Sequence, residues 1–201
     1  MISGSVGISL LFAHSPEIDL TRLRFEPFTS DSLQVKSFDC GNKDLNDFLC
    51  TEEVAKYEAE LFGKTTLAYY DGHLVAYYTI SNAVLRKEYL QTHRSFTRLG
   101  EYRVEGIPAI AIGRLAVDMK WQNMGIGRLI IQRIAMYALD SSKYSGTRLL
   151  IIQAKQEAFD FYKKLGFEFV EDTKRERQRF KARGTRTMFF DVKALDYLRT
   201  H

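Results

Sequence analysis

The chain has 201 residues, enough for a single domain whose core needs no disulfide or metal to fold. Apolar residues make up 45% and charged residues 27%, which is close to globular usage, and only three prolines argue against long irregular linkers. The net charge of +4 allows an anionic partner without requiring one.

The cysteines and the N-terminus indicate the protein class. Cys40 and Cys50 are ten residues apart, too far for a metal pair, and the four histidines are scattered, so we expect reduced thiols, no metal site and a cytoplasmic protein. The first thirteen residues contain a short apolar run with no Lys or Arg before it, and this run is too short to cross a bilayer. We expect residues 1–20 to be an N-terminal extension and residues 21–201 to be one domain.

The front half begins with a strand over residues 20–28, ended by Pro27. Helical spacing follows over residues 41–62, with Asn42 or Asp44 as cap and Gly63 as stop. The apolar face predicted for this helix consists of Leu45, Phe48, Leu49, Ala55, Ala59 and Phe62.

A hairpin comes next. Two β-rich runs, residues 65–70 and 74–81, flank Asp71-Gly72, which is typical of a type I′ turn because both central residues need positive φ. Residues 82–107 are polar and basic and predict a helix-plus-loop region.

The back half alternates strands and helices. We predict a buried strand over 109–117, a helix over 126–139 with Ile130, Ile131, Ile134, Ala135 and Ala138 inward, a strand over 148–153, a helix over 156–165 closed by Gly166, a strand over 167–170, a charged connector and a last strand over 185–192. This order favours an α/β (α+β) fold with a single mixed, mostly antiparallel sheet and helices on both faces.

One turn has the pattern of a phosphate-binding device. A buried strand leads through glycines into a helix, whose first N–H groups lack intrahelical partners and whose dipole favours anions. Gly125 and Gly127 permit close approach of an anion, Gln122 can add an amide donor, and Arg128 adds a cation. Alone the element is a weak indication, but the residues required for a P-loop or a dinucleotide fold are missing.

The surrounding motifs resemble the GNAT acetyltransferase superfamily. Its Arg/Gln-x-x-Gly-x-Gly/Ala motif is matched by Gln122 to Gly127, and its second motif by Ala158, Phe161, Tyr162, Gly166 and Phe167. The resemblance implies the GNAT fold, acetyl-CoA as co-substrate, pyrophosphate binding by the turn and pantetheine contacts along the strand end. The implied cofactor-binding residues are Leu115, Ala116, Val117, Gln122, Asn123, Met124, Gly125, Ile126, Gly127 and Arg128.

Tyr162 is the candidate catalytic residue. A leaving thiolate, with a pKa of about 8.5, benefits from a proton donor, and a tyrosine near 10 stays protonated at neutral pH. Family position indicates the same residue, although a packed tyrosine at a helix end is the alternative. No equally good base is evident, because Glu157 and Asp118 both suit structural roles. A site without a base favours an α-amine, near 7.7, over a lysine near 10.4.

The front half narrows the resemblance to the GNAT toxins of toxin–antitoxin pairs. It is carried by Phe38 to Asn42, Leu45 to Leu49, Tyr77 to Ser81, Pro108 and Gly113 to Asp118. It implies acetylation of the α-amine of aminoacyl-tRNA and neutralisation by a ribbon-helix-helix antitoxin, while GNAT domains also commonly form homodimers.

Two basic stretches could hold a phosphate backbone. One contains Lys174, Arg175, Arg177, Arg179, Lys181, Arg183 and Arg186 against a single acid, Glu176; the other contains Arg86, Lys87, Arg94, Arg98 and Arg103. The alternative for each run is a solvated hairpin or loop. Two alternatives for function also stay open: a GNAT enzyme acting on a protein N-terminus, lysine or small amine, and a non-catalytic module that binds CoA or RNA.

Overall fold

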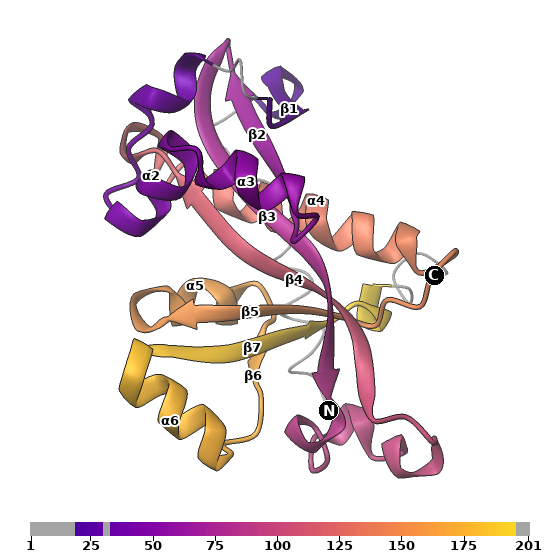
Figure 1. Ribbon diagram of the computed structural model, residues 1–201. Helices are drawn as coiled ribbons and strands as arrows, with labels where there is room; N and C mark the ends of the chain where they lie inside the picture. Colours follow the sequence, from indigo (N-terminus) through magenta and orange to yellow (C-terminus); the bar gives the residue numbers. More distant parts are fainter. Residues whose placement is uncertain (1–18, 30–32, 196–201) are drawn as a thin grey trace. The chain divides into compact units, whose positions relative to one another are not determined.

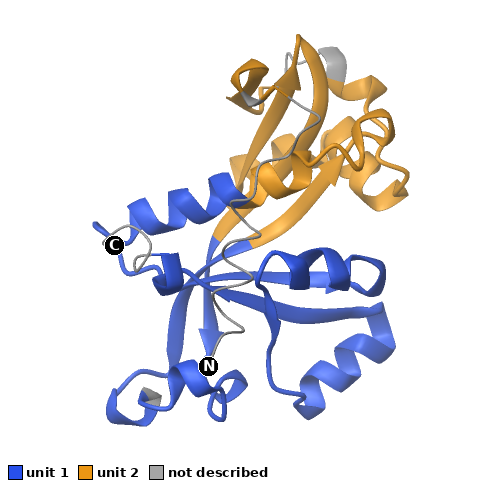
Figure 2. Ribbon diagram, turned by 180° about the vertical axis from the view of Figure 1, so that it is seen from behind, with its two compact units in different colours: residues 1–13, 82–111, 132–201 blue, residues 14–81, 112–131 orange. Residues whose placement is uncertain are grey.

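The computed structural model describes residues 19–29 and 33–195, so the predicted extension over residues 1–20 lies almost wholly outside it. The chain divides into two compact units (Figure 2). We call the described parts of 14–81 and 112–131 the N-terminal unit, and those of 82–111 and 132–201 the C-terminal unit. Both lie within the region predicted as one domain, residues 21–201, and that assignment stays a prediction.

The described residues form a seven-stranded sheet in the order β1-β2-β3-β4-β5-β7-β6 (Figure 1). The strands are β1 (Leu23–Pro27), β2 (Lys64–Tyr70), β3 (His73–Arg86), β4 (Gly106–Val117), β5 (Leu149–Lys155), β6 (Glu168–Phe169) and β7 (Thr185–Asp191). The pairs β1/β2, β2/β3, β5/β7 and β6/β7 are antiparallel. The predicted mixed, mostly antiparallel sheet is confirmed.

The described helices vary in length. The α-helices are α2 (Lys43–Cys50), α3 (Glu53–Ala59), α4 (Ile126–Ser141), α5 (Phe159–Lys164) and α6 (Lys174–Arg183). The 3-10 turns are η1 (Leu20–Arg22), η2 (Leu33–Ser37), η3 (Lys87–Tyr89), η4 (Arg94–Phe96), η5 (Leu99–Glu101), η6 (Met119–Trp121) and η7 (Gln156–Ala158). In the part of the chain that the structure describes, every helix is too short or too polar to span a membrane.

The helix predicted over residues 41–62 is in fact two helices, α2 and α3. The Asn42 cap is confirmed, since its side chain accepts the Leu45 N–H, but Thr51 adopts an extended backbone conformation and interrupts the helix. Because α3 stops at Ala59, Phe62 never reaches the predicted apolar face and is 61% exposed. Val54, which the prediction omitted, is fully buried instead.

The hairpin prediction is confirmed at its turn. Asp71 and Gly72 have φ of +50° and +81°, and the flanking residues Tyr70 and His73 are paired. The region predicted as helix-plus-loop differs, because β3 continues to Arg86 and the chain then forms the 3-10 turns η3, η4 and η5 before β4. A strand continues where the sequence alone suggested a helix.

The helix predicted over residues 126–139 is α4, and all five side chains predicted to point inward are at most 1% exposed. The helix closed by Gly166 is also confirmed, with η7 preceding α5 and a φ of +87° at the glycine.

The charged connector before the last strand is a helix, α6, which packs against β7 in the C-terminal unit (Figure 1). Thr173 Oγ1 accepts the N–H of Glu176, and Gly184 ends the helix at a φ of +63°. A Thr-x-x-Glu start and a terminal glycine are ordinary helix boundaries. Because the segment is densely charged, the sequence pattern did not predict these helix boundaries.

Candidate acetyl-CoA site

The turn after β4 belongs to the N-terminal unit and is built from short, capped segments. β4 ends at Val117, and the Asp118 carboxylate caps η6 by accepting the Lys120 N–H at 3.0 Å. The chain then takes positive φ at Asn123, +65°, and at Gly125, +85°, before α4 begins. Asparagine and glycine are the residues that tolerate this conformation best.

The start of α4 presents backbone donors. In its first turn the Leu129 N–H donates to the Gly125 carbonyl at 3.2 Å. The N–H groups of Ile126 and Gly127 come earlier, and by helix geometry they have no acceptor within the helix. Sixteen residues of aligned peptide dipoles lie behind them. This arrangement fits the anionic oxygens of a pyrophosphate, so the residues present fit acetyl-CoA.

The side chain of Gln122 makes two hydrogen bonds within the protein. Its side-chain nitrogen donates to the carbonyls of Cys40 and Val117, each at 3.0 Å, so both amide hydrogens already have acceptors. Asp118 reinforces the same connection, because its carboxylate accepts the Asp39 N–H at 3.1 Å. Gln122 therefore holds the turn to the end of β4 and to the loop before α2, and in this arrangement its amide cannot also donate to a phosphate.

The end of β4 divides its side chains between two faces, since successive residues of a strand alternate. Ala116 is 4% exposed and packs in the apolar core of the N-terminal unit. Leu115 and Val117 are half-buried on the other face. The pantetheine contacts are expected from the backbone of all three residues, so the burial of the Ala116 side chain does not affect that prediction.

Tyr162 lies on α5 in the C-terminal unit. It is 5% exposed, with its ring 4.9 Å from that of Phe161 and 5.4 Å from that of Phe167. Burial raises the pKa of its phenol above the ordinary value, because a phenolate would be poorly solvated there. The hydroxyl therefore remains protonated throughout the physiological pH range and can act as a hydrogen-bond or proton donor.

Neither acid considered as a general base has the properties of one. Both oxygens of Asp118 accept backbone N–H groups, which makes it a turn former. Glu157 lies in η7 with an exposed side chain. The prediction that neither Asp118 nor Glu157 is the general base therefore stays a prediction.

Arg114 is a residue whose position the sequence reading did not anticipate. Its guanidinium lies 3.5 Å from the centre of the Phe48 ring and pairs with Glu53 at 3.2 Å. It thereby ties the middle of β4 to α2 and α3. The signal was available, since Arg114 is the one charged residue in the apolar run of residues 109–117.

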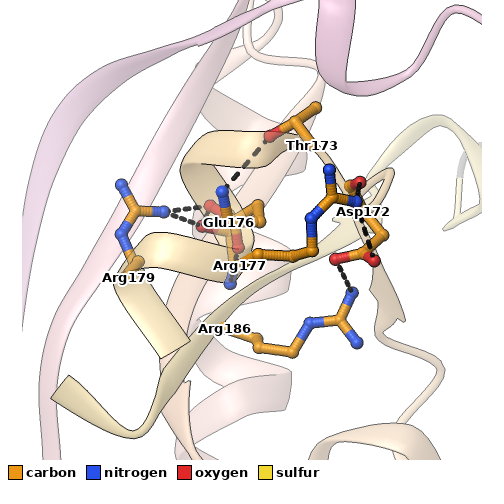
Figure 3. Close-up of polar contacts among 7 residues, drawn as sticks. Asp172, Thr173, Glu176, Arg177, Arg179 and Arg186 are labelled. Atoms are coloured by element: carbon orange, nitrogen blue, oxygen red, sulfur yellow. Dashed lines mark hydrogen bonds and ion pairs between the residues drawn. The ribbon is translucent and has the colours of Figure 1, made fainter. Parts of the chain in front are cut away.

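The basic run of α6 is not uniformly solvated (Figure 3). Arg177 and Arg186 pair with Asp172, at 3.3 Å and 3.8 Å, and Arg179 pairs with Glu176. Glu176 is fully buried and also accepts the Thr187 N–H at 2.8 Å. The interpretation as a solvated hairpin is therefore wrong for Arg179 and Glu176, which belong to a buried network.

Comparison with known proteins agrees with this geometry. The model of the acetyltransferase (GNAT) domain family matches residues 62–169, just over half of the chain. A tRNA-acetylating toxin of Mycobacterium tuberculosis (strain ATCC 25618 / H37Rv) is 26% identical over 141 residues, covering 69% of this chain and 81% of that protein.

Solved structures show the same fold. AtaT complexed with acetyl-methionyl-tRNAfMet matches with a TM-score of 0.72 at 24% identity, over 88% of this chain and 98% of that one. A variant of AtaT bound to the C-terminus of the antitoxin AtaR and to acetyl-CoA matches with a TM-score of 0.67 at 23% identity, over 89% and 99%. The family match over more than half of the chain shows that this chain belongs to the GNAT family and is an acetyl-CoA-dependent N-acetyltransferase.

Proposed function

We propose that this enzyme acetylates the α-amine of aminoacyl-tRNA and acts as the toxin of a toxin–antitoxin pair. The observation that carries the proposal is the likeness to a tRNA-acetylating toxin over 69% of the chain. AtaT, which shares the fold, has been solved with acetyl-methionyl-tRNAfMet. The absence of an evident base at Asp118 or Glu157 agrees with an amine that is partly neutral at pH 7.

The proposed roles of the residues follow from their chemistry. The backbone donors of Ile126 and Gly127 would bind the pyrophosphate, with Asn123, Met124, Gly125 and Arg128 shaping the turn, and Leu115 and Val117 would contact the pantetheine arm. Bound acetyl-CoA supplies an activated thioester whose carbonyl the amine attacks. Tyr162 would donate its phenolic O–H to the sulfur as the thiolate departs. Burial raises the pKa of Tyr162, so its hydroxyl is protonated when the amine attacks.

The proposal extends to partners and location. An enzyme that acts on aminoacyl-tRNA would work in the cytoplasm, where its substrate is. AtaT has been solved with the C-terminus of its antitoxin AtaR, and we propose a comparable antitoxin, of the ribbon-helix-helix class, for this chain. A homodimer is proposed by analogy with GNAT domains in general.

The test is mass spectrometry of a mixture of charged tRNAs after incubation with acetyl-CoA. We expect N-acetylated aminoacyl ends with the native enzyme. The Gly125→Glu variant should give none, because a carboxylate would repel the pyrophosphate and a side chain is strained at a φ of +85°. If protein N-termini, lysines or small amines were acetylated while tRNA stayed unmodified, the acceptor would belong to one of those classes instead. Acetyl-CoA binding without transfer to any amine would favour a non-catalytic module.

A further inference from the structure

The outward face of α6 has an unusual charge pattern. The helix holds six cations and one acid, and the acid, Glu176, is fully buried. At 100° per residue, Lys174, Arg177 and Lys181 fall along one side of the helix, and Arg175 lies on the adjoining side, about 100° from Lys174. All four side chains are exposed. This face is therefore cationic, and of these four cations Arg177 is paired with Asp172, just before the helix.

This arrangement does not serve the stability of the helix. Cations in the first turn, Lys174 and Arg175, oppose the helix dipole, which favours negative charge there. Like charges three and four residues apart also repel, at about 0.2–0.5 kcal/mol per pair. A polyanion would relieve both effects.

The inward face, by contrast, fixes the helix firmly. Glu176 accepts the N–H and the hydroxyl of Thr187 on β7, at 2.8 and 2.9 Å, and Arg179 donates to the same hydroxyl at 2.6 Å. Thr173 caps the first turn at 3.2 Å, and Asp172 holds Arg177 (Figure 3). The outward cations are thus carried on a rigid support.

The location of α6 connects it with the proposed catalytic tyrosine. Within the C-terminal unit the ring of Phe180 on α6 lies 6.4 Å from that of Phe159 on α5, and Phe159 precedes Tyr162 by one helical turn. A nucleic-acid backbone bound along α6 would therefore lie near the part of the C-terminal unit that contains Tyr162.

We infer that α6 is a docking helix for the phosphate backbone of the acceptor RNA, with Lys174, Arg175 and Lys181 as the contacting cations. The inference rests on the proposed function, because it takes the RNA to be the aminoacylated substrate. Arg177, Arg179 and Arg186 are excluded from the contact set, since Asp172 already holds Arg177 and Arg186, and Glu176 holds Arg179.

The test compares two double variants that each remove two exposed helical lysines. K174Q/K181Q changes α6, and K43Q/K56Q changes α2 and α3 as the matched control, where the side chains are 84% and 75% exposed. Binding of uncharged tRNA is measured by fluorescence anisotropy between about 50 and 200 mM salt. Because each phosphate contact contributes about 0.7–0.9 to the salt slope, we expect K174Q/K181Q to lower the slope by roughly 1.5 and the affinity at 0.1 M salt by at least about tenfold. The control should match the native protein.

Kinetics separate this inference from the proposed function. With charged tRNA, K174Q/K181Q should raise KM without lowering kcat, as expected for lost backbone contacts. The native enzyme could acetylate charged tRNA while both double variants keep its salt slope and its KM. That result would overturn the docking helix and leave the proposed function intact. A different result would be that K174Q/K181Q, but not the control, loses tRNA binding while the native enzyme acetylates no tRNA. This result would support an RNA-binding α6 and refute the proposed function. An equal loss of affinity for duplex DNA would refute the assignment to the acceptor RNA.

Discussion

At the scale of single residues, the neighbouring groups decide what a polar side chain can do. Tyr162 and Gln122 both match family motifs, yet their surroundings differ. The Tyr162 phenol is buried among aromatic rings and stays protonated, which suits a donor. The Gln122 amide already donates to two carbonyls, which makes it a positioning residue. A motif identifies the residue, and its neighbours determine the role.

Tyr162→Phe tests the proposed donor. Removing the hydroxyl keeps the packing, so we expect kcat for acetyl transfer to fall by roughly 10²- to 10⁴-fold while the dissociation constant of acetyl-CoA stays within about twofold. Stopped-flow or steady-state kinetics together with calorimetric binding would measure both quantities. An unchanged kcat would show that Tyr162 is merely a packed side chain.

Alkaline pH gives a second test of the tyrosine environment. Burial is the main cause that raises the folded-state pKa of both Tyr77 and Tyr162. The unfolded chain should therefore ionise first, so stability stays flat below about pH 10 and falls above it, by up to about 1.4 kcal/mol per pH unit for each tyrosine. Urea unfolding at pH 8 to 11 would measure the slope, and Tyr162→Phe should reduce it. Identical slopes would contradict the buried phenol.

Gln122→Ala distinguishes positioning from direct phosphate binding. Loss of the two bonds to Cys40 and Val117 should lower the free energy of unfolding of the ligand-free protein by about 1 kcal/mol, in addition to weakening acetyl-CoA binding. Thermal unfolding without ligand is the measurement. Weaker binding with unaltered ligand-free stability would restore Gln122 as a phosphate donor.

At the scale of elements, α6 and the α2–α3 break show where sequence patterns mislead. A side-chain cap begins a helix in both places, at Asn42 and at Thr173. The continuous apolar spacing through residues 41–62 nevertheless concealed the interruption at Thr51, and the run of charges concealed α6. Periodicity reports which side of an element is apolar, so it fails for a helix attached by a buried carboxylate.

Three substitutions measure how α6 is attached. Glu176→Gln should lower the free energy of unfolding by about 3 kcal/mol, because it removes one partner of a buried ion pair. Thr173→Ala should cost about 1 kcal/mol through loss of the cap. Arg177→Ala, which breaks an exposed pair, should change stability by less than about 1 kcal/mol. Urea unfolding gives all three values; equal effects would mean that Glu176 is not an anchor.

At the scale of the whole molecule, the proposed activity has a cellular consequence. Expression of the native chain in a bacterial host should arrest growth, because acetylated aminoacyl-tRNA cannot supply its amine to peptide bonds. Tyr162→Phe and Gly125→Glu should each relieve the arrest at equal protein levels. Growth curves and immunoblots after induction would measure this. Normal growth with the native chain would count against toxicity while leaving the acetyltransferase chemistry untouched.

Much of this protein was determined by its sequence alone. Local signals fixed the Asp71-Gly72 turn, the buried face of α4, the glycine at the end of α5 and the turn from Gln122 to Gly127, because each depends on backbone conformation or periodicity within a short segment. Only the tertiary structure decided that Gln122 is held by Cys40 and Val117, that Arg114 stacks on Phe48, and that Glu176 is buried against Thr187. Those roles depend on partners distant in sequence, and no local pattern specifies which acceptor or ring a polar side chain will meet.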